Sequence, residues 1–193
     1  MISDSGSLIL LLGGARAGKS AFALRLAEAR CSRPDAKVCL IATAQALDED
    51  MTARIARHRE QRPSDWQTIE EPFRIDEALR QASEAEIVIV DCLTLFVSNW
   101  LLRHDDEHEC EQLVRRTARD FLELARSRRQ TIICVSNETG LGVVPETRLG
   151  RVFRDVLGRV NQDFAAAADK VYLLVAGLSV QLKPTSAELT VFE

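Results

Sequence analysis

The chain has 193 residues, of which 46% are hydrophobic and 28% are charged. A chain of this length can bury one sizeable core and is too short for two, so we expect a single domain over residues 1–193. The formal net charge of −4 provides no chain-wide positive field, which argues against nucleic acid or an anionic membrane as a partner. These properties favour a protein that acts on small molecules.

The cysteines and the first apolar run indicate where the protein works. The five cysteines are an odd number, lie far apart and include no C-x-x-C pair, so we expect neither a disulfide framework nor a zinc ribbon. The run from Leu8 to Leu12 is too short for a secretory signal or a membrane span. We expect a cytoplasmic protein with reduced thiols and no stable membrane insertion.

Short apolar runs alternate with longer segments of helical period, which is typical of an α/β fold with a mostly parallel sheet flanked by helices. We expect the last two strands to form an antiparallel edge hairpin around Ala176-Gly177-Leu178, followed at 184–193 by either a further edge strand or a tail. The expected strands are Leu8 to Leu12, Val38 to Ala42, Gln67 to Glu70, Ile87 to Asp91, Thr131 to Ser136, Val171 to Val175 and Val180 to Lys183. The expected helices are Ser20 to Arg30, Asp48 to Arg62, Asp76 to Ala82, Glu109 to Arg128 and Glu146 to Ala168.

The turn after the first expected strand carries the strongest motif, G-x-x-x-x-G-K-[ST], in the strand-to-helix context where it binds nucleotide phosphates. Glycines let backbone N–H groups curl around phosphate oxygens, and the helix N-terminus adds the positive end of its dipole. Lys19 adds a point charge, and Ser20 can ligate magnesium. We therefore expect a P-loop NTPase-type, RecA-like fold. Its phosphate cradle consists of Gly13, Gly14, Ala15, Arg16, Ala17, Gly18, Lys19 and Ser20.

The expected helix Asp48 to Arg62 contains His58, the only histidine in a strongly helical segment. Asp48 can cap the helix, and Pro63 ends it. Met51, Ile55 and His58 fall at i, i+4 and i+7, so we expect their common face to point at protein. A lone histidine on such a face is usually a core or interface residue, and the pattern by itself favours that interpretation.

Arginines are dense on the same helix, at positions 54, 57, 59 and 62. Such a cluster suits the binding of a triphosphate. It is equally typical of a solvated face that pairs with the acidic residues of the same segment. The pattern supports both interpretations.

The apolar run Ile87 to Val90 ends in Asp91, as does the strand that supplies the acidic partner of a P-loop metal. We therefore expect Asp91 to bind magnesium, although a strand-terminal aspartate can also simply cap the segment that follows. The histidines at positions 104 and 108 also have the i, i+4 spacing of metal ligands. Their acidic, polar surroundings indicate a solvated loop instead.

The last expected helix carries an apolar stripe at spacings of three and four residues, which we expect to face the core. The loop before it contains two glycines and a proline between a strand end and a helix start, the edge at which α/β sheets place ligands. The stripe consists of Leu149, Val152, Phe153, Val156, Leu157 and Val160.

From Leu8 to Lys183 the sequence resembles the bifunctional adenosylcobinamide kinase / adenosylcobinamide-phosphate guanylyltransferase family of cobalamin biosynthesis. The family has serine where this chain has Ala17, a small-for-small change in a loop that acts through its backbone. The segments that carry the resemblance are Gly13 to Ser20, Ile41 to Gln45, Arg54 to Arg59, Arg62-Pro63, Asp91 to Thr94, Ser136 to Glu146, Asn161-Gln162 and Ala165 to Asp169.

The resemblance implies phosphorylation of adenosylcobinamide, then transfer of GMP from GTP to adenosylcobinamide phosphate with release of pyrophosphate. It implies GTP as substrate, ATP or GTP as phosphoryl donor, and Mg²⁺. By its position in the family motif, His58 becomes the covalent carrier of GMP, in place of the structural role that its pattern favours. A neutral imidazole can attack the α-phosphorus, and cations offset the charge that develops on pyrophosphate.

The resemblance further implies a homotrimer and a corrinoid that the loop Glu138 to Glu146 holds or gates. It also assigns nucleotide contacts in and around the expected sheet edge. These contacts are Ala42, Thr43, Ala44, Arg59, Glu60, Gln61, Arg62, Glu70 and Asp91.

Two other classes of protein share the P-loop pattern. One is a P-loop kinase of another small molecule, in which His58 is structural; the other is a RecA-like, ATP-driven binding module without covalent chemistry. A GTP-dependent covalent adduct on the protein separates both from the guanylyltransferase.

Overall fold

The computed structural model describes residues 6–31, 36–60, 62–104 and 106–184. Within these ranges one sheet contains seven strands in the order β3-β2-β4-β5-β1-β6-β7. Every neighbouring pair is parallel except β6 and β7, which confirms the predicted mostly parallel sheet with an antiparallel edge hairpin. The strands are β1 (Ser7–Gly13), β2 (Val38–Ala42), β3 (Gln67–Glu70), β4 (Ile87–Asp91), β5 (Thr131–Val135), β6 (Lys170–Val175) and β7 (Leu178–Lys183).

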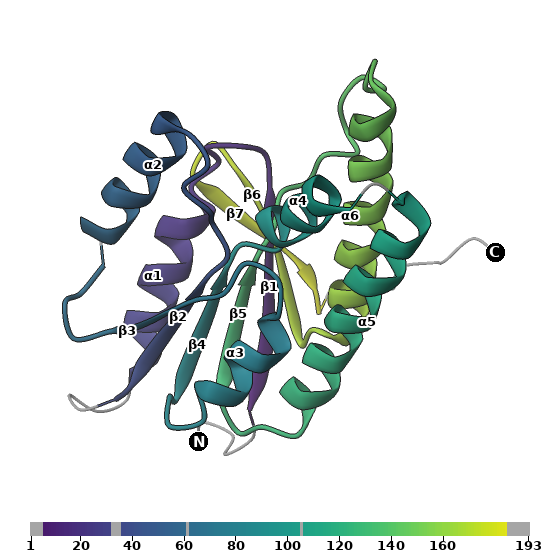
Figure 1. The fold of residues 1–193 in the computed structure, drawn as a ribbon. Helices are drawn as coiled ribbons and strands as arrows, with labels where there is room; N and C mark the ends of the chain where they lie inside the picture. The colour runs from purple at the N-terminus through teal and green to yellow at the C-terminus, as the bar shows by residue number, and fades with distance from the viewer. Residues whose placement is uncertain (1–5, 32–35, 61, 105, 185–193) are drawn as a thin grey trace.

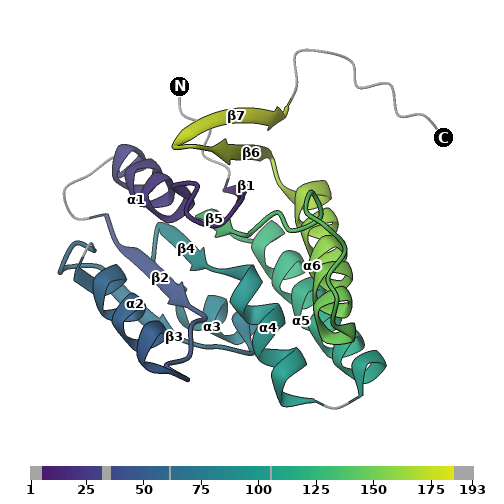
Figure 2. The ribbon, with the colours of Figure 1, turned by 90° about the horizontal axis from the view of Figure 1, so that it is seen from above.

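Helices cover both faces of the sheet, because the central strands are buried on both faces. Figure 2 shows α1 on one side and α3, α4, α5 and α6 on the other. The helices are α1 (Lys19–Arg30), α2 (Glu49–Glu60), α3 (Ile75–Gln81), α4 (Leu93–Arg103), α5 (Glu107–Arg126) and α6 (Arg148–Ala167).

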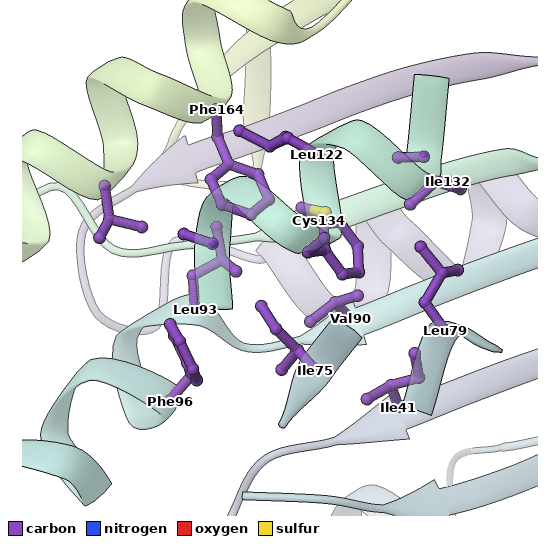
Figure 3. Packing of buried hydrophobic residues seen from close by; sticks show 14 of the residues in the cluster. Ile41, Ile75, Leu79, Val90, Leu93, Phe96, Leu122, Ile132, Cys134 and Phe164 are labelled. Atoms are coloured by element: carbon purple, nitrogen blue, oxygen red, sulfur yellow. The ribbon is translucent and has the colours of Figure 1, made fainter. Parts of the chain in front are cut away.

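The larger part of the core lies between the sheet and the four helices α3 to α6. Figure 3 shows Phe164 of α6, Phe96 of α4 and Ile75 of α3 around Val90 of β4 and Cys134 of β5. All five side chains are almost completely buried. This packing holds the carboxyl ends of β4 and β5 in fixed positions, and those ends border the P-loop.

Helix α2 differs from the others, because none of its residues is buried. It stands off the body of the molecule on the side of β2 and β3 (Figure 1). Its N-terminus is capped as predicted, since the Met51 N–H donates to Asp48 Oδ1 at 2.6 Å. Met51, Ile55 and His58 are its only half-buried residues, which confirms the face that the spacing predicts.

Three expectations were wrong in detail. Helix α4 was not expected. Helix α5 begins at Glu107, after an N-cap at Asp106 whose carboxylate accepts from two backbone N–H groups, so His108 lies in its first turn and not in a loop. Leu149 is 44% exposed, so the apolar stripe of α6 reaches the core only from its second turn onward.

The hairpin turn consists of Ala176 and Gly177, which both have positive φ, of 51° and 81°. Two such residues form the tight turn that matches the twist of antiparallel strands. Leu178, expected in the turn, is the first residue of β7. Among the described residues, no helix combines the length and the apolar character that crossing a membrane requires.

Candidate functional site

The predicted phosphate cradle, the P-loop Gly13 to Ser20, joins the end of β1 to the start of α1. Gly13 has a φ of 151°, and a Cβ there would lie 2.4 Å from the carbonyl oxygen of Leu174, so no other residue fits. Gly18 precedes α1 in the left-handed conformation, with a φ of 93°, which also favours glycine. The two glycines set the path of the loop toward the N-terminus of α1, where backbone N–H groups can bind phosphate.

The turn of the C-terminal hairpin supports the P-loop. The Gly177 N–H donates to the carbonyl oxygen of Ala17 at 3.1 Å, and a Cβ on Gly18 would lie 3.5 Å from the Gly177 Cα. In the register of the sheet, Gly13 pairs with Leu174. The loop therefore rests on β6 and its turn, and Ala17 contributes through its backbone.

Lys19 is buried, and its Nζ donates to the carbonyl oxygens of Gly13 at 2.9 Å and Gly14 at 2.6 Å. Burial lowers the pKa of Lys19, and the neighbouring Cys92 and Asp91 partly oppose that effect. The ammonium group thus lies at the inner side of the loop. A phosphate in the loop would meet this cation together with the free backbone N–H groups.

A cavity of about 820 Å³ opens in front of the P-loop; we call it the P-loop cavity. Its lining includes the loop residues Arg16 to Ser20, Arg54, Arg57 and His58 of α2, and Asp91 at the end of β4. Arg54 and Arg57 of α2 and Lys19 of the P-loop line the same cavity, together with Asp48, Asp50 and Asp91. The three cations suit the binding of a polyphosphate.

A second cavity of about 240 Å³, here the side cavity, lies on the other side of His58. His58 and Asp91 line both cavities. The surface of the side cavity is mostly apolar, and its charged or ionisable lining residues are Arg54, His58, Arg59, Arg62, Glu70 and Asp91. Residues that line it alone include Ala42, Ala44, Ile55, Arg59, Arg62 and Glu70.

The register of three strands explains why residues far apart in sequence meet at the side cavity. Ala42, at the end of β2, pairs with Glu70 of β3 on one side and with Asp91 of β4 on the other. Because parallel strands end at the same edge of a sheet, the three residues form one row. Arg59 of α2 forms an ion pair with Glu70, which ties the helix to this row.

His58 lies next to Asp91 where the two cavities meet. His58 Nδ1 is 3.8 Å from Asp91 Oδ2, within ion-pair range and beyond a direct hydrogen bond. The His58 side chain is 32% exposed and that of Asp91 15%, so water or substrate reaches both. A carboxylate near Nδ1 favours the imidazole tautomer with its proton on Nδ1, which leaves the Nε2 lone pair free.

Thr43, expected to contact nucleotide, is completely buried and lines neither cavity. Its hydroxyl donates to the Cys92 carbonyl oxygen at 2.7 Å and accepts from the Cys92 N–H at 2.8 Å. Its own N–H donates to the Asp91 carbonyl oxygen at 3.2 Å, and its carbonyl oxygen accepts from Asn99 Nδ2 at 2.8 Å. The first three bonds hold the backbone on both sides of the Asp91–Cys92 peptide bond, which is cis, and the fourth ties Thr43 itself to α4.

The remaining predicted contacts lie around the end of α2. Arg62 lines the side cavity, and burial lowers its pKa, against the opposing effect of the Asp91 carboxylate. Glu60 is exposed and lines neither cavity. Gln61 lies outside the described residues.

Ser20 and Asp91, the predicted magnesium ligands, line the same cavity. Within the described ranges, no group of three or more His, Cys, Asp or Glu side chains converges as a metal site. A magnesium ion that arrives with a nucleotide needs few protein ligands, since phosphates and water complete its octahedron. One hydroxyl and one carboxylate therefore fit such an ion.

The other two histidines have ordinary contacts. The His104 ring stacks on Trp100, with centroids 5.3 Å apart. His108 contacts the Gln112 side chain at 2.9 Å. Neither lines the P-loop cavity or the side cavity.

Thr94 and Asn137 also line the P-loop cavity. Both lie in segments that carry the family resemblance, and Thr94 was expected on the same rim as Asp91, whereas Asn137 was given no role of its own. Thr94 is buried in the first turn of α4, and Asn137 follows the end of β5. The signal for Asn137 was a polar residue directly after an apolar strand that neighbours the P-loop strand. Thr94 was expected beside Asp91 because it follows the same strand end, although the helix that carries it, α4, was not expected.

The chain is similar to several known proteins. The chain is 44% identical over 180 residues to the bifunctional adenosylcobalamin biosynthesis protein CobP of Pseudomonas aeruginosa, covering 90% of this chain and 96% of the relative. It is 39% identical over 185 residues to the bifunctional adenosylcobalamin biosynthesis protein CobU of Escherichia coli, covering 91% and 99%. A KaiC-like protein of Pyrococcus horikoshii superposes with a TM-score of 0.49 at 16% identity, over 88% of this chain and 71% of that one. Residues 9–182 match the family model, and the chain belongs to the cobinamide kinase / cobinamide phosphate guanyltransferase family.

Proposed function

We propose that this protein phosphorylates adenosylcobinamide and transfers GMP from GTP to adenosylcobinamide phosphate, with His58 as the covalent carrier. The products of the second reaction are adenosylcobinamide-GDP and pyrophosphate. Family membership supports the two activities. One observation carries the assignment of the carrier: His58 is the histidine that borders both the P-loop cavity and the side cavity.

The two cavities suggest how GTP is divided between them. The P-loop cavity, with Lys19 and the N-terminus of α1, suits the β- and γ-phosphates. The side cavity is mostly apolar and ends at Glu70, whose carboxylate can accept hydrogen bonds from the N1 and N2 donors of guanine. This placement puts the α-phosphate between the cavities, beside His58.

Residues that line the two cavities can assist each bond change of the GMP transfer. A neutral nitrogen of His58 attacks the α-phosphorus, and the bond from that phosphorus to the bridging oxygen breaks, releasing pyrophosphate. The cations Lys19, Arg54 and Arg57 line the space where pyrophosphate gains charge. A phosphate oxygen of adenosylcobinamide phosphate then attacks the same phosphorus, the P–N bond breaks, and His58 is regenerated.

Asp91 has two roles in this proposal. With Ser20 it would hold Mg²⁺, which supplies positive charge near the phosphates when bound. Its carboxylate also lies 3.8 Å from His58 Nδ1, close enough to favour the tautomer that carries the proton on Nδ1 and leaves Nε2 free. The first role acts on the leaving pyrophosphate, and the second acts on the nucleophile.

The kinase reaction uses the same P-loop without a covalent carrier. The terminal phosphate of ATP or GTP passes in line to the adenosylcobinamide hydroxyl, a transfer that depends on positioning and charge and not on a protein nucleophile. His58 is therefore required for one reaction and dispensable for the other.

The loop Glu138 to Glu146 is proposed to hold the corrinoid, as the resemblance implies. Its apolar side chains Leu141, Val143 and Val144 are 87%, 93% and 60% exposed, at the edge of the sheet beside the P-loop cavity. The homotrimer is likewise proposed on the resemblance. Sedimentation analysis tests it, and a monomer would contradict it.

The decisive experiment compares wild type with His58→Ala, and with His108→Ala as the matched control outside both cavities. Intact-mass spectrometry after incubation with Mg²⁺ and GTP is expected to show a GMP adduct in wild type and in His108→Ala only. The His58→Ala protein should keep its melting temperature and measurable kinase activity but form no adenosylcobinamide-GDP. A GMP adduct on well-folded His58→Ala protein would exclude His58 as the carrier. Loss of both activities together with a lower melting temperature would indicate a structural histidine.

A further inference from the structure

Asn137 lies between the two strands that supply the P-loop and Asp91. Its strand, β5, is the sheet neighbour of both β1 and β4, and Val135 pairs with Leu11 on one side and Asp91 on the other. Two residues beyond Val135, Asn137 reaches the P-loop cavity, and it does not border the side cavity. It therefore faces the space proposed for the phosphates and not the space proposed for guanine.

The backbone of Asn137 is held by a set of polar contacts. Its N–H donates to Thr94 Oγ1 at 2.7 Å, and its carbonyl oxygen accepts from Asn161 Nδ2 at 3.0 Å. The Ser136 hydroxyl donates to Asn161 Oδ1 at 2.7 Å, and both of these residues are buried. The next N–H, of Glu138, donates to the carbonyl oxygen of Gly13 at 3.1 Å, which ties the segment to the first residue of the P-loop.

The Asn137 side chain itself is uncommitted. Within the described ranges its carboxamide has no hydrogen-bond partner, although the residue is half-buried. The polar side chains of Ser136, Thr94 and Asn161 are all engaged in hydrogen bonds. The contacts thus fix the backbone of Asn137 at the border of the P-loop cavity and leave its amide available, an arrangement suited to a ligand.

We propose that the Asn137 NH₂ group donates a hydrogen bond to the terminal phosphate of the nucleotide in the P-loop cavity. Asn161 is a positioning residue that acts through Asn137. The proposal rests on the proposed nucleotide site and adds a group that distinguishes a triphosphate from a diphosphate. It follows from geometry: β5 ends beside β1, so a residue just past its end lies beyond the phosphates that the loop itself surrounds.

The test measures binding and needs no turnover. Isothermal titration calorimetry compares α,β-methylene GTP with α,β-methylene GDP, whose bridging carbon prevents cleavage beside the α-phosphorus. In wild type the triphosphate should bind more tightly. In Asn137→Ala this preference should fall about 10-fold, and in Asn137→Asp about 100-fold, because a carboxylate repels the phosphate. Thr139→Ala, in the same segment but outside both cavities, should leave the preference unchanged.

Asn161→Leu separates positioning from direct contact. It should lower the preference by a smaller factor, and the double variant Asn137→Ala/Asn161→Leu should have the same preference as Asn137→Ala alone. Losses that multiply in the double variant would overturn the positioning role.

Two further outcomes would overturn the proposal. Equal weakening of triphosphate and diphosphate binding in Asn137→Ala would overturn it, since Asn137 would then only support the loop. An unchanged preference in Asn137→Ala, alongside weakened binding of both analogues in Lys19→Ala, would remove Asn137 and leave the nucleotide site intact. If wild type bound neither analogue, the proposed function and this inference would both fall.

Discussion

Thr43→Val tests whether a buried hydroxyl, and not a nucleotide contact, explains Thr43. The substitution keeps the shape of the side chain and removes both of its hydrogen bonds to the Cys92 backbone. The Cys92 carbonyl oxygen keeps a partner, because it also accepts from the Phe96 N–H at 3.2 Å. The main cost in stability is therefore that the buried Cys92 N–H is left without a hydrogen-bond acceptor.

An unsatisfied buried donor costs about 1–3 kcal/mol, and a lost hydrogen bond whose acceptor keeps a partner costs about 1 kcal/mol. We therefore expect Thr43→Val to lower the free energy of unfolding by about 2–4 kcal/mol. In a chain of this size that loss corresponds to about 5–15 °C in melting temperature. Both reactions should slow about 10-fold, because the Asp91 carboxylate is no longer held in place.

Thr43→Ser is the matched control, since it keeps the hydroxyl and loses one methyl group, at a cost of about 1 kcal/mol. Thermal melts followed by circular dichroism, together with assays of both reactions, compare the three proteins. A Thr43→Val protein that melts within about 1 °C of wild type but binds GTP much more weakly would refute this reasoning. It would support the direct nucleotide contact instead.

Three further predictions concern the charged groups of the site, the P-loop glycines and Cys92. Lys19→Ala and Asp91→Asn should each slow both reactions at least about 100-fold, and rates for Asp91→Asn within about three-fold of wild type would exclude its metal role. Gly13→Ala should be destabilised by about 3 kcal/mol or more in thermal melts, whereas Gly14→Ala, whose Cβ would meet nothing within 4 Å, should melt near wild type. Burial, with a smaller contribution from Asp91, raises the pKa of Cys92 from 9.0 to about 11. Because the thiolate is the reactive form, iodoacetamide at pH 8 should label Cys92 on the order of 100-fold more slowly than a thiol of ordinary pKa, and the rate should rise toward pH 11. Rapid labelling at pH 8 would contradict this.

The sheet could be predicted because its strands are nearly uniform apolar runs that end at turn signals. Helix α4 could not be predicted for a related reason. Seven of its residues from Leu93 to Leu102 are apolar, and the polar Thr94 and Asn99 are buried with them between the sheet and α6. A mostly apolar segment with polar residues on its buried side shows no clear helical period and is easily taken for a loop or a strand.

The candidate site shows a similar division. The P-loop and Asp91 could be found from local patterns, because each motif lies within one strand and its turn. The side cavity could not, since it needs the register that places Glu70 and Asp91 on either side of Ala42. Only the resemblance pointed to Ala42 and Glu70, and it could not distinguish the buried Thr43 from its neighbours that line the cavity.

The hairpin β6–β7 has a consequence for how far the nucleotide motif can be separated from the rest of the chain. A shortened protein ending at Asp169 would retain all eight P-loop residues, His58 and Asp91. It would lose the Leu174 backbone against which Gly13 packs and the Gly177 N–H that bonds to Ala17, and β1 would become an edge strand. We expect such a protein to lose nucleotide affinity even if it folds. The P-loop motif therefore cannot be expected to keep its conformation by itself, because the backbone that supports it belongs to the last two strands.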